Sequence, residues 1–308
     1  MFVVCGEALM DVFAVGDTAT GMTMDARIGG SPFNVAVGLA RLGQPVGFFG
    51  ALGHGFLGER LLRALRAEGV DTGCTPVLDA PTTLSLVGLD QHGVPSYAFY
   101  GAGCADRLLP ATALDLVPAG ARAFHFGSFA MVVEPVARTQ RMLVERERGR
   151  SLIAYDPNIR LNVEPELQRW RDTLAWMAER AHLLKVSDED LALLFPGADV
   201  AALAHGWLAA GVGLVVVTRG GEGAAAWARG VHVHAEPQRV LVVDTVGAGD
   251  TFQAALLTWL AERGRLSPES VRDWNEADLL AALGFAGRAA AVTCSRRGAD
   301  LPRRSELA

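Results

Sequence analysis

Runs of apolar, β-branched residues alternate with helix-like segments along most of this chain, and this alternation constrains the fold more than any other feature. Strands are predicted at 2–5, 46–52, 123–126, 152–155, 182–186 and 214–218, and helices at 31–42, 57–68, 135–147, 187–194 and 200–210. The strand at 214–218, Leu-Val-Val-Val-Thr, lacks polar alternation, which is typical of strands buried on both faces. The pattern predicts an α/β fold in which helices cover both faces of a mostly parallel sheet.

Two segments interrupt the alternation in the first third of the chain. The segment 11–28 lacks a helical period, and 82–100 reads as two antiparallel strands joined by the turn-rich linker 91–95. Together they are predicted to form a small β-sheet set apart from the main sheet, as a lid or a dimer surface. We therefore expect a single domain over 1–308, with this small sheet, formed by about 11–28 and 82–100, inserted in it.

Composition and charge argue against several classes of protein. A net charge of −6 without a basic block argues against nucleic-acid binding. The first residues carry no basic segment typical of a signal peptide, and the apolar stretches fall short of the ~20 residues that span a membrane. Four scattered cysteines without a Cys-x-x-Cys pair favour reduced thiols in the cytoplasm, and seven histidines without ligand spacing argue against structural zinc.

Three glycine-rich loops are candidates for ligand binding, and each has a structural and a functional interpretation. Gly53, Gly55 and Gly58 match the spacing of a dinucleotide-binding loop, or form a plain turn that needs a permissive backbone. The loop 218–223 approaches a ligand phosphate, or is a glycine hairpin. The segment 29–34 holds a polar ligand at a helix N-terminus, or is a routine cap in which Ser31 caps the helix and Pro32 follows.

The stretch from Val240 to Leu260 carries the strongest chemical signal. Its apolar start, 240–243, predicts a buried strand, and its second half predicts a helix that begins with Gly247, Ala248 and Gly249. Small residues at a helix N-terminus leave N–H groups free for phosphate oxygens. Asp250 in the first turn is either the proton acceptor for a hydroxyl that attacks phosphorus or a residue that favours the helix dipole. The residues alone leave both interpretations open.

The basic residues contain one anomaly. Lysine and arginine together number 28, and only Lys185 is a lysine. A lone lysine is either a compact charge that a site requires or a chance survivor on the surface. Composition does not separate these two interpretations.

Two motifs, "GGSPFNVAVGLARLG" at 29–43 and "DTVGAGDTFQAALL" at 244–257, resemble the N- and C-terminal motifs of the ribokinase-like carbohydrate kinases, also called the phosphofructokinase-B type. "GEALMDV", "DPNIR", "KVSDEDL", "VVTRGGEGA" and "AAAVTCSRRGA" appear in family order, so the resemblance runs over nearly the whole chain and is closest to the bacterial fructokinases. It implies a three-layer α/β sandwich with a small β lid over a sugar. It also implies transfer of the ATP γ-phosphate to a sugar hydroxyl with Mg²⁺.

The resemblance assigns roles to particular residues. It implies that Asp250 is the catalytic base and that the N–H groups of Gly247, Ala248 and Gly249 form the anion hole. Sugar binding is implied for Asp11, Gly30, Asn34, Asn158 and Arg160, and nucleotide binding for Lys185, Ser187, Thr218, Gly220 and Gly223, with 281–291 as the adenine wall. Asp190 matches an acid that orders Mg²⁺ through water, and Asp244, the Val246 carbonyl and Gly298 match a loop for a monovalent cation, usually K⁺.

Four positions depart from the family pattern. Ser187 replaces an asparagine common in the wider family, although fructokinase-like members often carry serine. His54 stands where an acid is common, and Gly287 stands where an asparagine near adenine is frequent. Gly101 follows Tyr100 where kinases of sugar acids tend to have an arginine, which argues against 2-keto-3-deoxygluconate as the substrate.

The expected function is an ATP-dependent sugar kinase, most simply a fructokinase that makes fructose 6-phosphate and dimerises through the lid. The alternatives are a kinase for another ketose, for 2-keto-3-deoxygluconate or for a nucleoside. A non-catalytic nucleotide- or sugar-binding regulator on the same fold belongs to a different class. Because Asp250 and the anion-hole glycines are both present, the enzyme is favoured over the regulator.

Overall fold

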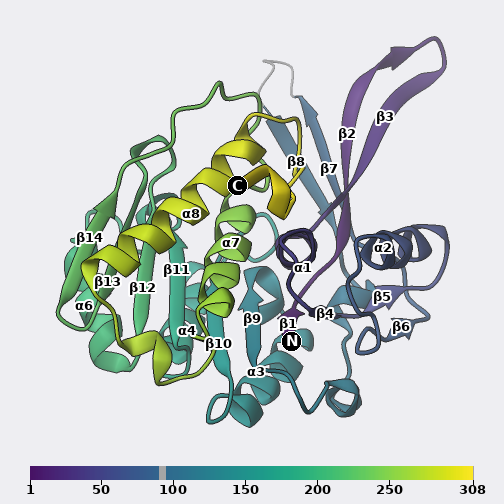
Figure 1. Cartoon of the computed structure of the whole chain (residues 1–308). Coiled ribbons are helices and arrows are strands. Elements are labelled where there is room, and N and C mark those ends of the chain that lie inside the picture. The colour runs from purple at the N-terminus through teal and green to yellow at the C-terminus, as the bar shows by residue number, and fades with distance from the viewer. Residues whose placement is uncertain (90–94, 308) are drawn as a thin grey trace.

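One large sheet forms the centre of the protein, and a smaller sheet stands at its side (Figure 1). The computed structural model describes residues 1–89 and 95–307. The large sheet has eight strands in the order β14-β13-β12-β11-β10-β9-β1-β4. They are β1 (Phe2–Cys5), β4 (Val46–Phe49), β9 (Ala123–Gly127), β10 (Leu152–Asp156), β11 (Leu183–Ser187), β12 (Leu214–Thr218), β13 (Ala224–Ala228) and β14 (Val231–Ala235). The strands from β4 to β12 are parallel, and β13 and β14 extend one edge in antiparallel fashion.

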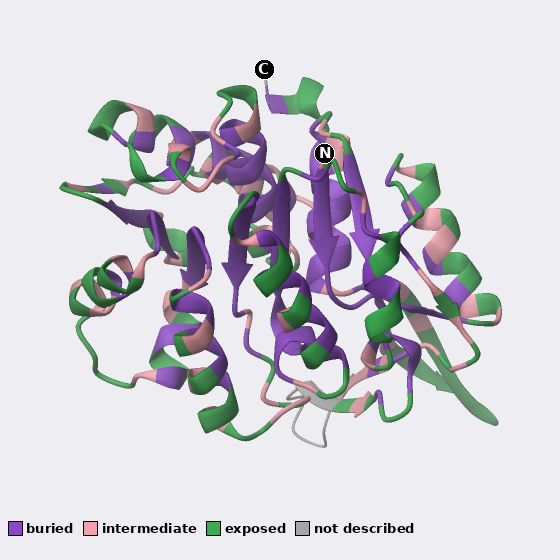
Figure 2. Ribbon diagram, turned by 90° about the horizontal axis from the view of Figure 1, so that it is seen from below, coloured by how far each residue is buried: buried purple, intermediate pink, exposed green. Residues whose placement is uncertain are grey.

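Helices cover both faces of this sheet, which confirms the predicted three layers. One layer contains α1 (Ser31–Arg41), α7 (Ala248–Glu262) and α8 (Glu276–Cys294), and the other contains α3 (Val136–Glu147), α4 (Leu167–Ala178), α5 (Asp188–Leu194) and α6 (Val200–Ala210). Phe2 and Val4 belong to the apolar core under the first layer, and Val3 and Cys5 to the core under the second. Because side chains alternate along a strand, the fully buried central strands contribute to both cores (Figure 2).

The length and composition of α8 also match those of a membrane-spanning helix, with 19 residues and a mean hydropathy of 1.3. No other helix in 1–89 or 95–307 matches in this way. Leu279, Leu283 and Phe285 of α8 are buried, and the helix packs against α7, β13 and β14. The apolar composition of α8 is therefore explained by its place in a helix layer.

The smaller sheet has four strands in the order β3-β2-β7-β8. They are β2 (Leu9–Thr18), β3 (Gly21–Gly29), β7 (Leu84–Leu89) and β8 (Pro95–Tyr100), so the two interrupting segments do form a separate sheet. The predicted linker 91–95 falls almost wholly outside the described residues. β2 and β3 form a long hairpin that projects away from the body of the molecule (Figure 1), and its outer part is exposed (Figure 2).

Short elements complete the chain. The predicted strand 46–52 is divided into β4 and β5 (Leu52–Gly53). β5 pairs with β6 (Val77–Leu78), and α2 (Phe56–Ala67) connects these two short strands along the chain. A Cβ atom on Gly58 would collide with the carbonyl oxygen of Gly53, so close packing of this turn explains its glycines. The 3₁₀ helices are η1 (Ala105–Arg107), η2 (Ala111–Leu116), η3 (Ser128–Met131), η4 (Gly220–Glu222), η5 (Ser270–Arg272) and η6 (Arg304–Leu307).

The prediction of a buried strand at 240–243 is wrong. This segment is a loop between β14 and α7, and Leu241 is 85% exposed. The N–H group of Val243 donates to the carbonyl of Cys294 at the end of α8, with an N–O distance of 2.8 Å. β-branched residues favour a strand only where a partner strand is available, and here the segment bonds to a helix end instead.

Candidate functional site

The carboxyl ends of the parallel strands meet the N-termini of α1 and α7 at one edge of the large sheet. Asp156, Ser187 and Thr218 are the last residues of β10, β11 and β12. Asp250 lies in the first turn of α7. In open α/β sheets this edge is where ligands bind. The fold therefore gathers residues here that lie nearly one hundred positions apart in the sequence.

Asp250 is buried, and both of its carboxylate oxygens accept hydrogen bonds from the first turn of α1. The Ser31 hydroxyl donates to Oδ1 at 2.7 Å, and the Asn34 amide Nδ2 donates to Oδ2 at 2.8 Å. Burial raises the pKa of Asp250, while these two hydrogen bonds and the charges of Lys185 and Arg160 oppose the shift. The result is a fixed carboxylate whose proton affinity is higher than that of an exposed aspartate.

The predicted helix cap at Ser31 is wrong. Gly30, at φ 107°, occupies the N-cap position, and Ser31 is the first helical residue. Residues three apart lie on the same face of a helix, so Ser31 and Asn34 both point at Asp250. Ser31 is thus a site residue that the sequence interpretation missed, although its spacing from Asn34 was a usable signal. The Asn34 amide, predicted to bind sugar, contacts Asp250 in this structure.

The loop before α7 has the form that an anion hole requires. Gly247 is the N-cap at φ 80°, and a Cβ atom there would lie 2.7 Å from the Cβ of Ala299, so only glycine fits. The N–H group of Ala248 donates to the Thr245 carbonyl at 3.2 Å. In the described chain, no backbone hydrogen bond uses the N–H groups of Gly247 or Gly249. Two of the three predicted donors are therefore free at a positive helix end.

Lys185 is buried directly beneath this loop. Its ammonium nitrogen lies 2.7 Å from Oδ2 of Asp156 and 3.2 Å from the place where a Cβ on Gly249 would stand. Burial alone would lower the pKa of Lys185, but the carboxylates of Asp156, Asp250 and Asp190 together outweigh burial and raise that pKa. The interpretation of Lys185 as a chance surface residue is wrong, because the only lysine supports the anion-hole loop from inside the protein.

Ser187 and Asp190 join β11 and α5 to the neighbouring loop 157–160. The Ser187 hydroxyl caps α5 by accepting from the Asp190 N–H at 3.0 Å, and Oδ1 of Asp190 accepts from the Ile159 N–H at 3.2 Å. Burial and the nearby Asp156 raise the pKa of Asp190 to about 6. Asn158, in the same loop, has a positive φ of 40°. These contacts fix the loop that also carries Arg160.

The turn after β12 exposes backbone where a nucleotide is predicted. Gly220 and Gly223 have positive φ angles of 48° and 85°, and the Arg219 N–H donates to the Gly223 carbonyl at 2.8 Å. A side chain on Gly223 would collide with the Ala235 carbonyl, whereas nothing lies within 4 Å of the Cβ position of Gly220. Gly287 on α8 faces Gln238, whose Cγ lies 3.9 Å from its Cβ position. An open strip of backbone thus follows Thr218.

Asp244 connects the two segments predicted to bind a monovalent cation. Its Oδ1 accepts from the Val246 N–H at 3.0 Å, and its Oδ2 accepts from the Gly298 N–H at 2.8 Å. Burial opposes ionisation, but these backbone donors outweigh it and lower the pKa of Asp244. The structure therefore brings Asp244, Val246 and Gly298 together. Within 1–89 and 95–307, no group of three or more histidine, cysteine or acidic side chains is arranged to hold a metal ion.

Two acidic residues, Glu7 and Asp11, lie just before β2 of the small sheet and within it. Burial raises the pKa of Asp11, and the Ser85 hydroxyl and Arg160 oppose that shift. Glu7, which the sequence interpretation missed, is fully buried, and burial raises its pKa to about 8. Its Oε2 has no hydrogen-bond partner in the described chain, and its carbonyl oxygen lies 2.8 Å from the Cβ position of Gly30. His54 is exposed at the start of α2.

Comparisons with known proteins point to one family of kinases. The family model described as "pfkB family carbohydrate kinase" matches residues 1–306. A fructokinase of Rhizobium leguminosarum bv. trifolii is 36% identical over 276 residues, which cover 90% of this chain and 84% of the relative. The crystal structure of a fructokinase from Xylella fastidiosa with bound ATP superposes with a TM-score of 0.87 at 27% identity, covering 99% of this chain and 96% of that one.

A further solved structure carries ligands at its site. The fructokinase of Vibrio cholerae O395, with fructose, ADP and a calcium ion bound, superposes with a TM-score of 0.81 at 28% identity, and the match covers 99% of this chain and 97% of that one. A double mutant of the same enzyme was solved with fructose, ADP and a potassium ion.

Proposed function

This chain belongs to the pfkB family of carbohydrate kinases, and we propose that it is an ATP-dependent fructokinase that phosphorylates fructose at its 6-hydroxyl. The observation that carries the proposal is the buried Asp250 next to the free N–H groups of Gly247 and Gly249. A carboxylate beside an anion-binding helix end suits the transfer of a phosphoryl group to a hydroxyl. The similarity to the Rhizobium leguminosarum fructokinase supports fructose as the sugar.

In the proposed reaction, Asp250 accepts the proton of the attacking sugar hydroxyl. A bond forms between that oxygen and the γ-phosphorus while the bond from phosphorus to the ADP oxygen breaks. The N–H groups of Gly247 and Gly249 would stabilise the negative charge that develops on the phosphoryl oxygens. Arg160 would contribute too, since its charge already opposes the rise in pKa that burial causes at Asp250, Asp190 and Asp11.

Two metal sites are part of the proposal. Mg²⁺, which neutralises phosphate charge, would be ordered through water by Asp190, because hard cations prefer carboxylate oxygens. Oδ1 of Asp156, whose other oxygen pairs with Lys185, is buried without a partner among the described residues. A monovalent cation, K⁺, would be held by Asp244, the carbonyl of Val246 and Gly298. These residues fit the two ions by donor type.

A substrate panel tests the proposed function. Purified protein with ATP and Mg²⁺ should release ADP fastest, judged by kcat/KM, with fructose among fructose, other ketoses, 2-keto-3-deoxygluconate and nucleosides. Addition of K⁺ should raise the rate, because the Asp244 loop adjoins the anion hole. ADP release with another substrate but not with fructose would contradict the assignment of the sugar. Absence of substrate-dependent ADP release with every compound would favour a binding regulator.

We also propose that the protein works as a cytoplasmic homodimer joined through the small sheet. The hairpin of β2 and β3 projects from the body and exposes the apolar side chains of Val15, Met22 and Met24. Apolar side chains gathered on a projecting hairpin favour contact with a partner surface. All four cysteines are free, which is consistent with a reducing compartment.

A charge placed on the hairpin should dissociate this dimer. In size-exclusion chromatography with light scattering, the double variant Val15→Asp and Met22→Asp is expected to have the mass of a monomer, while the parent protein has the mass of a dimer. Val77→Asp, which alters an exposed valine on β6 outside the hairpin, is the matched control and should leave the mass unchanged. Equal masses for the parent and the hairpin variant would contradict dimerisation through this sheet.

A further inference from the structure

Arg107, at the end of η1, is held between two aromatic rings. Its guanidinium carbon lies 5.4 Å from the ring centre of Phe99 on β8 and 5.6 Å from that of Phe129 on η3. The two rings meet edge to face with centroids 5.6 Å apart. One ring belongs to the small sheet and the other to the body, so cation–π contacts fix the guanidinium at the junction between them.

Gly101 leaves the space that this guanidinium occupies. A Cβ atom on Gly101 would lie 2.7 Å from both Cζ and Nε of Arg107, so any other residue at 101 would displace the arginine. The sequence interpretation treated the glycine after Tyr100 as the loss of a cation at this place. The structure places the guanidinium of Arg107, six positions later in the chain, directly against this glycine.

The pairing of the small sheet places Arg107 beside the sugar side of the site. Asp11 on β2 pairs with Ser85 on β7, and Ser85 pairs with Phe99 on β8. Directly paired residues of neighbouring strands project from the same face of a sheet. A Cβ atom on Gly29 would collide with Oδ2 of Asp11, and the helix α1 that begins two residues later contacts Asp250 through Ser31 and Asn34, so Asp11 lies on the side of the sheet that leads to Asp250. Phe99 and the arginine that covers it therefore extend the row that begins with Asp11.

Polar atoms in this row lack partners. Nε of Arg107 is buried and makes no hydrogen bond with any residue that the structure describes. The neighbouring Asp106 accepts from the Thr83 hydroxyl through Oδ1 at 2.5 Å, while its Oδ2 has no partner among the same residues. Buried donors and acceptors without partners are costly. A ligand with hydroxyl groups, which both donate and accept, would satisfy them.

We propose that Arg107 is a specificity-determining residue of the sugar site. Its Nε donates a hydrogen bond to a sugar oxygen at the end of the substrate that is remote from Asp250, and Phe99 and Phe129 hold the guanidinium plane for that bond. The ligand class is a polyhydroxylated ketose, whose ring oxygens suit a planar guanidinium donor. This inference rests on the proposed function, because it concerns the same substrate.

The test pairs a variant with substrate analogues. Arg107→Met should raise the KM for fructose by about tenfold or more, the loss expected for one hydrogen bond to a charged group. The KM for ATP and kcat should change by less than about threefold, because Arg107 lies away from the phosphoryl transfer. The parent should also have a lower KM for fructose than for at least one of three analogues that each lack one hydroxyl group. The analogues are 1-deoxyfructose, 3-deoxyfructose and 2,5-anhydromannitol. In Arg107→Met that discrimination should disappear.

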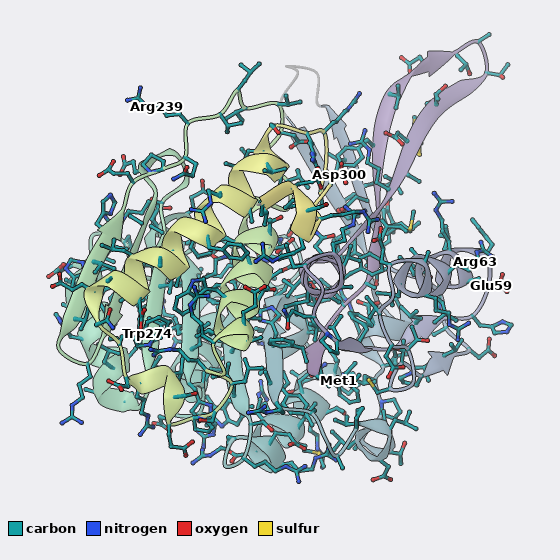
Figure 3. All side chains as sticks on the ribbon, in the orientation of Figure 1. Met1, Glu59, Arg63, Arg239, Trp274 and Asp300 are labelled. Carbon is teal, nitrogen blue, oxygen red and sulfur yellow. The ribbon has the colours of Figure 1, made fainter. Side chains whose placement is uncertain are left out.

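Two further variants separate contact from packing. Arg107→Lys keeps the charge but not the planar donor, so its KM for fructose should stay raised. Arg63→Met, on the outer face of α2 (Figure 3), is the matched control and should behave like the parent. An unchanged KM in Arg107→Met would overturn the proposal. A KM that rises equally for fructose and for every analogue would also overturn the proposal, because lost packing alone leaves the discrimination between them intact.

Failure of the proposed role of Arg107 and failure of the proposed function would give different results. Failure of the parent to phosphorylate fructose would contradict the fructokinase assignment and not the role of Arg107. The same comparison would then use the sugar that the parent does phosphorylate, together with the deoxy analogues of that sugar. Thermal unfolding of each variant shows whether a change in KM accompanies a loss of folded protein.

Discussion

Asp250→Asn is expected to lower kcat by roughly 10²–10⁴-fold, while the KM values for ATP and sugar change only a few fold. Asparagine has the shape of aspartate, but its amide does not accept the proton of the sugar hydroxyl. The pocket tolerates the change, because the Ser31 hydroxyl still has an oxygen acceptor and the Asn34 amide can turn its own oxygen toward the new NH₂ group. Steady-state kinetics with both substrates varied is the measurement.

Glu276→Gln is the matched control for this experiment. Glu276 also lies in the first turn of a helix, α8, and carries the same charge at a similar place in the helix dipole. If Asp250 served only the dipole, the two variants would lose similar and small amounts of stability and neither would lose turnover. A near-normal kcat in Asp250→Asn would remove Asp250 from the role of base.

Lys185→Met is expected to lower the free energy of unfolding by about 3–5 kcal/mol, the usual cost when one partner of a buried ion pair is removed. Asp156 would then stay buried with both oxygens unpaired, since its Oδ1 already lacks a partner in the described chain. Activity should fall as well, because the ammonium lies next to Gly249 in the anion-hole loop. Denaturant unfolding and kinetics at a temperature where the variant is folded measure the two effects.

The double variant Lys185→Met with Asp156→Leu separates stability from activity. An apolar pair of similar volume often equals or exceeds a buried ion pair in stability. The double variant should therefore recover most of the lost stability and still have low turnover. Recovery of both properties would show that the ion pair has no part in the reaction, and recovery of neither would contradict the assignment of the loss to the unpaired Asp156.

Local patterns predicted the elements of the large sheet well, and the reason is physical. The first four residues of the strand 214–218 are buried between two helix layers, which favours apolar side chains at each of them, and this leaves a clear signal in the sequence. The boundaries of α6 and β1 were also predicted to the residue. The segment 240–243 gave the same signal without being a strand, because whether a partner strand is available depends on the rest of the fold.

Contacts over long separations set the details of the site and were beyond the sequence. The pairing of Lys185 with Asp156 and the bonds from Ser31 and Asn34 to Asp250 join residues that no local pattern connects. The family resemblance located Asp250 and the anion-hole loop, but not what lies beneath them. Arg107 shows the same limit, because its position against Gly101 depends on how η1 folds back on β8.

Because Lys185 is buried and is the chain's only lysine, the folded protein presents no side-chain amine to its surroundings. Lysine acetylation, ubiquitination and other amine-directed modifications therefore have no side-chain target on the native surface. The ammonium group lies against Gly249, so opening of the anion-hole loop would expose it. The rate at which an amine reagent labels Lys185 would consequently report how often the centre of the protein opens.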